Sequence, residues 1–174
     1  SAGLIVTTSG ASADCSGSGG VYTCSGEITG TQTLTGDPLS VTISEGTTVK
    51  VTSGDAFTLT GNAGIIFKDE TAGATITGGW SGIMATSSGT GGISITTKGK
   101  TTITGDDYGI VAKNYSTGAL SITTTGETKG TDYDGIYATN EGTSLTINAA
   151  DTTGGTNGIY ARNSGTSLTI VTGE

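Results

Sequence analysis

Four aspartates are the residues of this chain best suited to chemistry. Asp106 and Asp107 are adjacent, and Asp132 and Asp134 are separated by one residue further along. Two carboxylates held side by side can hydrolyse a glycosidic bond or bind calcium. Aspartate is also a common corner residue in β proteins. Solvated corners, a calcium site and the catalytic pair of a carbohydrate-active enzyme are therefore all open, and we favour solvated corners.

Other patterns of catalytic and metal-binding residues are missing from the sequence. There is no histidine, which excludes Ser-His-Asp and Cys-His catalysis and removes the commonest metal ligand. The glycine cluster at 17–20 is not followed by the Lys-Ser/Thr of a phosphate-binding loop. The calcium-binding repeat GGxGxD does not occur. We therefore expect a protein that is not an enzyme and that needs no cofactor or metal.

The only two cysteines, Cys15 and Cys24, enclose a short segment rich in glycine and serine. A disulfide between them would stabilise the fold by roughly 2–3 kcal/mol, and it would persist in an oxidising compartment. Two free thiols are the alternative. A zinc site is not expected, because two thiols without histidine do not complete the usual four-ligand shell.

Charge and hydropathy exclude several kinds of partner. The net charge is −8, and the seven basic residues are spread from Lys50 to Arg162 without a cluster. This distribution argues against binding to nucleic acid or to an anionic membrane. No apolar run approaches 18 residues, so we expect no membrane insertion. The 32 glycines could indicate disorder, but the apolar residues recur regularly, which favours an ordered fold.

A short phrase recurs five times and predicts the elements that position these residues. A second apolar phrase follows each copy, most clearly as SLTI at 144–147 and 167–170. A period in the twenties with strand-like phrases and glycine-rich connectors predicts an all-β fold, a parallel β-solenoid of about seven turns. The copies GIIFKD, GIMATS, GIVAKN, GIYATN and GIYARN begin at Gly64, Gly82, Gly109, Gly135 and Gly158.

Strand alternation then assigns the side chains to the inside or the outside of the coil. We expect the second phrase to place pairs such as Ala74/Ile76, Ile93/Ile95 and Leu120/Ile122 on one inward column. A third, shorter strand is expected at 101–104 and at 127–129. The inward column of the first phrase would contain Ile65, Ile83, Ile110, Ile136 and Ile159.

The outward column of the first phrase is the candidate binding surface. A contiguous exposed apolar patch often marks such a surface, and tyrosine and arginine are favoured interface residues. The alternative is a column that packs on itself and only stiffens the rod. The candidate residues are Ile66, Met84, Val111, Tyr137 and Tyr160, with Arg162 beside them.

Three asparagines, Asn114, Asn140 and Asn163, end successive copies of the phrase. Stacked side-chain amides can hydrogen-bond along the axis of a stacked β structure, and buried polar groups need partners. We therefore expect a structural ladder of asparagines rather than a binding site.

The two ends of the chain differ in pattern. An open solenoid end exposes core residues and strand edges, so we assign 1–26, with its cysteine loop, to an N-terminal cap and 27–174 to solenoid repeats. Residues 1–6 lack the charged start and long apolar core of a signal peptide. We expect a processed N-terminus and a chain cut from a longer solenoid.

The repeated pattern GI[YVM]A[TKR]N…[SG]xL[TS]I and the loop CSGSGGVYTCSG resemble passenger domains of bacterial autotransporters over most of residues 15–174. The resemblance implies a right-handed, single-stranded parallel β-helix that is secreted or displayed on the bacterial surface. The serine-protease motif of one branch of that family has no match here. The resemblance therefore points to the non-protease branch.

For function, the resemblance implies an adhesin or virulence factor that binds a host-cell surface receptor or a matrix component. A narrower form of this expectation is a growth-factor-like, angiogenic ligand of a host receptor. Self-association between rods, which would aggregate bacteria, is the alternative. The carbohydrate-active enzyme based on the four aspartates is a third hypothesis from a different class.

Overall fold

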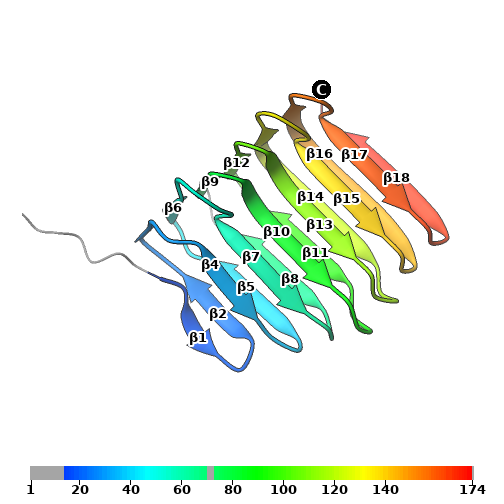
Figure 1. The fold of residues 1–174 in the computed structure, drawn as a ribbon, viewed down its shortest axis with the longest axis horizontal. Coiled ribbons are helices and arrows are strands. Elements are labelled where there is room, and N and C mark those ends of the chain that lie inside the picture. Colours follow the sequence, from blue (N-terminus) through cyan, green and yellow to red (C-terminus); the bar gives the residue numbers. More distant parts are fainter. Residues whose placement is uncertain (1–13, 70–72, 174) are drawn as a thin grey trace, which may run out of the picture.

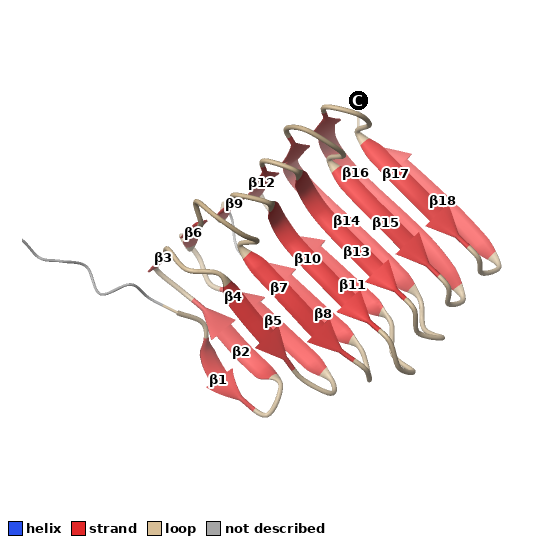
Figure 2. Ribbon diagram, in the orientation of Figure 1, coloured by secondary structure: helices blue, strands red, loops and turns tan. Residues whose placement is uncertain are grey.

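The computed structural model describes residues 14–69 and 73–173 (Figure 1). All regular elements in these residues are strands, eighteen in number. The described residues therefore contain no helix that could cross a membrane. The strands stack coil upon coil into a parallel β-solenoid, and successive coils lie side by side along one axis (Figure 2).

One side of the solenoid is a six-stranded parallel sheet, which we call face 1. Each strand is one passage of the chain, so five full turns separate the first strand from the last. The expected number of about seven turns was slightly too high. In order along the axis the strands are β4 (Gln32–Thr35), β7 (Phe57–Gly61), β10 (Ser81–Ser87), β13 (Tyr108–Asn114), β15 (Ile136–Asn140) and β17 (Ile159–Asn163).

The other two sides, face 2 and face 3, are joined into one sheet by two long strands, β14 (Leu120–Gly130) and β16 (Ser144–Gly154), which contribute to both. The remaining strands of face 2 are β2 (Val21–Cys24), β5 (Leu39–Ile43), β8 (Ile65–Asp69), β11 (Ile93–Thr97) and β18 (Ser167–Thr172). Those of face 3 are β3 (Glu27–Ile28), β6 (Thr48–Lys50), β9 (Thr75–Gly78) and β12 (Thr102–Gly105). The third short strand predicted at 101–104 and 127–129 is thus present.

Equivalent residues of successive coils lie over one another, as the repeat predicts. Ile83, Ile110, Ile136 and Ile159 are paired in register along face 1, and the first three are fully buried. On face 2, Ile93, Leu120, Leu145 and Leu168 are likewise paired in register. This continuous inner column gives a chain of low hydrophobic content a core that neighbouring coils share.

The earliest copy of the phrase does not belong to this column. Ile65 lies on face 2, where it pairs with Leu39 and Ile93, and the face 1 partner of Ile83 is Phe57. A full coil takes about 26 residues (57 to 83), whereas Ile65 precedes Ile83 by only 18 (65 to 83). The phrase GIIFKD resembles the others in sequence but falls one strand later in its coil.

The same shift moves the segment after GIIFKD to another face. Ile76 pairs with Val49 and Ile103 on face 3, so the predicted column of Ala74 and Ile76 with Ile93 and Ile95 was wrong. Both residues are nevertheless buried. Their inward orientation was therefore predicted correctly, although their position in the coil was not.

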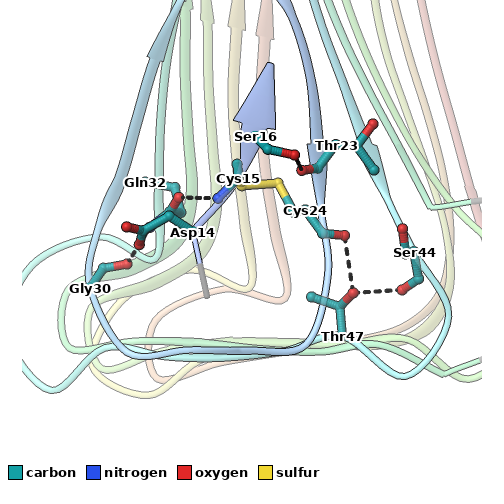
Figure 3. The surroundings of a disulfide bond; sticks show 9 residues. All are labelled: Asp14, Cys15, Ser16, Thr23, Cys24, Gly30, Gln32, Ser44 and Thr47. Carbon is teal, nitrogen blue, oxygen red and sulfur yellow. Dashed lines mark hydrogen bonds between the residues drawn. A yellow bond between two sulfur atoms is a disulfide. The ribbon is translucent and has the colours of Figure 1, made fainter. Parts of the chain in front are cut away.

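A disulfide between Cys15 and Cys24 lies at the N-terminal end of the described solenoid (Figure 3). Strand β1 (Ser16–Ser18) pairs antiparallel with β2 and covers its free edge. The backbone N–H of Cys15 donates to the side-chain oxygen of Gln32 at 2.8 Å. Gln32 pairs with Phe57, so a polar amide ends the face 1 core column. Residues 1–13 of the predicted 1–26 cap lie outside the described part.

Candidate binding face

The predicted outward stripe exists on face 1 for four of its five members. Met84, Val111, Tyr137 and Tyr160 pair with one another in register on β10, β13, β15 and β17. The column continues toward the N-terminal end with Thr58 on β7. Its character therefore changes along the axis, from hydroxyl to aliphatic to aromatic side chains.

Ile66 is not part of this stripe. It lies on face 2, where it pairs with Ser40 and Ser94, and its side chain is 48% exposed. Its assignment to the stripe was wrong for the reason given for Ile65, because GIIFKD occupies a different strand of its coil. Its two neighbours in this column are therefore serines, and it borders a separate face 2 recess together with Pro38 and Ala63.

Val111 has the predicted position but not the predicted exposure. Its side chain is only 2% exposed, and in the column it lies between the longer side chains of Met84 and Tyr137. A partner that approaches face 1 would therefore touch the methionine and the tyrosines rather than this valine.

Four tyrosines form a continuous cluster at the C-terminal half of face 1. The rings of Tyr137 and Tyr160 are nearly parallel, with centroids 4.9 Å apart. Tyr108 stacks on Tyr133 at 5.1 Å and meets Tyr137 edge to face at 5.9 Å. Both arrangements are favourable for aromatic pairs. These contacts fix the ring orientations, so the cluster forms a preformed surface.

Two members of this cluster, Tyr108 and Tyr133, were not predicted from the sequence. Both come just before a repeat glycine, at the corner that leads into face 1, and sequence alone does not show that a corner side chain folds back onto the sheet. Burial raises the pKa of Tyr108, and the nearby carboxylate of Asp134 raises it further. The Tyr108 phenol therefore loses its proton less readily than an ordinary tyrosine.

A second outward column on face 1 contains the only charged residues of its six strands. Lys113 pairs with Thr139, and Thr139 pairs with Arg162. The ammonium group of Lys113 lies 6.0 Å from the ring centroid of Tyr137, within reach of a cation–π interaction. Arg162 therefore lies beside Tyr160 on β17, as predicted. The second cation, Lys113, lies two strands away on β13.

These residues surround a shallow recess of about 210 Å³, which we call the Lys113–Arg162 recess. It lies where face 1 turns toward face 2. Its lining is mostly polar and combines two cations, one carboxylate and two phenol rings. The lining residues are Lys113, Tyr115, Tyr137, Thr139, Asn140, Glu141, Arg162 and Ser164.

The predicted asparagine ladder is present at the C-terminal ends of β13, β15 and β17. The side-chain amide of Asn114 donates to the side-chain oxygen of Asn140 at 2.6 Å, and Asn140 donates to Asn163 at 2.7 Å. Asn114 and Asn140 are buried. The ladder satisfies buried polar groups of the corner and supports the strands beneath the recess.

The four corner aspartates lie at equivalent corners of neighbouring coils. The backbone N–H of Asp132 donates to the carbonyl oxygen of Asp106 at 2.8 Å, so this pair is stacked as the repeat predicts. The carboxylate of Asp134 is buried and accepts a hydrogen bond from Asn157 at 2.7 Å. No group of three or more Asp, Glu, Cys or His side chains able to hold a metal occurs within 14–69 and 73–173.

Comparison with known proteins adds no relative to this picture. No protein-family model matches the chain, and no curated protein and no solved structure matches it significantly. The surface of face 1 is therefore the basis on which we infer a function.

Proposed function

We propose that this protein is a binding protein without catalytic activity that presents face 1 to a protein of a host-cell surface or extracellular matrix. The observation that carries the proposal is the composition of the outward side of face 1. Tyrosines, Met84 and Arg162 are gathered there, and none of its six strands contains Asp or Glu. Protein interfaces are enriched in tyrosine, methionine and arginine and depleted in carboxylates.

The geometry of the tyrosine cluster supports recognition of a macromolecule by a rigid surface. Tyr137 is held between the ring of Tyr160 and the ammonium group of Lys113. Side chains that are already ordered lose little conformational entropy when a partner binds. The parallel sheet below them is equally fixed, so the surface needs no rearrangement before it binds.

The location that we propose is outside the bacterial cell, either secreted or on the cell surface. The disulfide supports this, because such bonds persist in oxidising compartments. A non-protease autotransporter passenger would match this location and this architecture. Its partner would be a host receptor or a matrix component, bound as an adhesin or as a growth-factor-like ligand.

Cell binding by a double variant tests the proposal. Labelled protein is titrated onto cultured mammalian cells, and Tyr137→Ser with Tyr160→Ser should weaken binding about tenfold or more, because truncation of interface tyrosines commonly has effects of this size. Ile66→Ser is the matched control, since it removes an exposed apolar side chain from face 2. Unchanged binding by the double variant, with its fold intact by circular dichroism, would refute the proposal.

A further inference from the structure

Face 1 differs in charge from the rest of the molecule. The chain contains 15 acidic and seven basic residues, yet the six strands of face 1 contain no acidic residue and two basic ones, Lys113 and Arg162. The only charged side chains on the strands of this sheet are therefore positive, on a molecule whose net charge is −8. Such a local reversal of sign can select the partner group that docks there.

The two cations are aligned along the axis. Thr139 pairs with both of them, so their backbones are about 10 Å apart, since each coil adds about 5 Å. Neither takes part in an ion pair with any carboxylate in the described part of the chain. Lys113 is half-buried and Arg162 is exposed. Two unpaired cations therefore border one recess with a hydroxyl between them.

We propose that the Lys113–Arg162 recess receives a carboxylate side chain, Asp or Glu, of the protein partner. This inference rests on the proposed function, because it assumes that a protein docks on face 1. An arginine guanidinium can hold a carboxylate by two parallel hydrogen bonds, and the lysine ammonium adds a second charge from the opposite side. The rings of Tyr115 and Tyr137 border the recess, and a docked partner surface would exclude water from it, which strengthens the charge interaction.

A protein carboxylate fits the recess better than a polyanion does. Nucleic acids and highly sulfated polysaccharides need many cations along their length, whereas face 1 offers two on a strongly acidic molecule. Glu141 also lines the recess and would repel a dense array of negative charges. One or two carboxylates on an otherwise neutral surface avoid this repulsion.

The test uses the same cells and the same binding assay as the proposed function. Lys113→Ala with Arg162→Ala should weaken binding about tenfold, and binding of this variant should lose most of its dependence on salt concentration. Glu141→Gln should strengthen binding, because it removes a negative charge from the recess. The matched control is Lys50→Ala with Lys129→Ala, which removes two cations from face 3 and should leave binding unchanged.

The outcomes separate this inference from the proposed function. If the tyrosine variant loses binding while the Lys113/Arg162 variant keeps it, the recess is not used although face 1 is. Equal losses for the face 3 control and the recess variant would mean that only net charge matters, which would also overturn the inference. Heparin and hyaluronan are added as soluble competitors. Competition by either one that disappears in the recess variant would assign the recess to a polysaccharide and refute a protein carboxylate.

Discussion

Thr128 occupies, one coil after Ile103, the same inward position in the core of face 3. The earlier coils place Ile28, Val49 and Ile76 in this column. The hydroxyl group of Thr128 is buried and has no hydrogen-bond partner among the described residues. The column therefore changes from apolar to polar at Thr128, and Thr152 continues it in the next coil. The buried hydroxyl of Thr128 costs free energy because its hydrogen bond to water is not replaced.

Thr128→Val should therefore stabilise the protein. The substitution replaces the hydroxyl by a methyl group of similar size, and the free energy of unfolding should rise by about 1 kcal/mol. Urea denaturation followed by circular dichroism measures this change. Thr104→Val, on the outward side of β12, is the control and should alter stability by less than about 0.5 kcal/mol. A loss of stability in Thr128→Val would mean that the hydroxyl does have a partner.

The asparagine ladder predicts which of two alanine substitutions lowers the free energy of unfolding more. Asn140 is buried and bonds to both neighbours, so Asn140→Ala leaves unpaired groups on both sides and should cost about 2–3 kcal/mol. Asn163 is half-exposed and bonds to one neighbouring asparagine and to the carbonyl of Ser167. Asn163→Ala should cost clearly less, about 1 kcal/mol. Urea denaturation measures the free energy of unfolding of both variants. Equal losses in Asn140→Ala and Asn163→Ala would contradict a continuous ladder.

How far the sequence predicted the fold can be seen at single residues. Ile110, Ile136 and Ile159 were placed in one column because their spacing is nearly constant and alternation determines the inward side. Ile65 and Ile66 do not lie in the predicted columns, because GIIFKD resembles the other phrases in sequence but is not one coil length away from the next copy. Phe57, which lacks the phrase but has the correct spacing, is the true member. The spacing of one coil thus predicts the position of a residue more reliably than similarity to the repeated phrase does.

The candidate site was predicted less completely than the fold. Tyr137, Tyr160 and Arg162 follow from strand alternation, since their backbones are regular. Tyr108 and Tyr133 could not be placed, because a corner residue can point in several directions and only the packing of neighbouring coils selects one. The recess depends on Tyr115 and Glu141, which sequence analysis would treat as ordinary turn residues. The repeat therefore predicts the side chains of the strands but not the orientation of side chains at the corners.

Two glycines, Gly105 at the end of β12 and Gly46 in a turn, should differ strongly in their tolerance of alanine. A Cβ on Gly105 would lie 1.9 Å from the carbonyl oxygen of Tyr108 and 2.5 Å from that of Trp80. These are backbone atoms that cannot move without opening the corner, so Gly105→Ala should cost more than about 3 kcal/mol. Near-ultraviolet circular dichroism should change as well, because Tyr108 belongs to the tyrosine cluster.

Gly46→Ala provides the matched comparison for this corner. Gly46 has a φ of +70°, and a Cβ there would meet no atom within 4 Å. Only the unfavourable backbone conformation remains, which costs about 1 kcal/mol. The near-ultraviolet spectrum should stay unchanged. If Gly46→Ala were as destabilising as Gly105→Ala, close backbone packing at the Gly105 corner would not be the cause.

The raised pKa of Tyr108 predicts a loss of stability in alkaline solution. Burial, and then the charge of Asp134, disfavour the phenolate in the folded protein and raise the pKa above its ordinary value of 10.0. The neutral phenol therefore contributes stability that is fully present below pH 10.0, the ordinary value, and is lost as pH rises through the raised pKa. Unfolding midpoints in urea, measured at increasing pH, should show this decline.

Tyr108→Phe removes the ionisable group and should flatten that alkaline decline, while the ring contacts with Tyr133 and Tyr137 are kept. Tyr115→Phe is the control, because Tyr115 is 49% exposed and should leave the pH dependence as it is. Absorbance of the phenolate in the folded protein provides a second measurement, in which Tyr108→Phe should remove the component that titrates last. An alkaline decline that is the same in Tyr108→Phe and in the unmodified protein would show that Tyr108 does not control it.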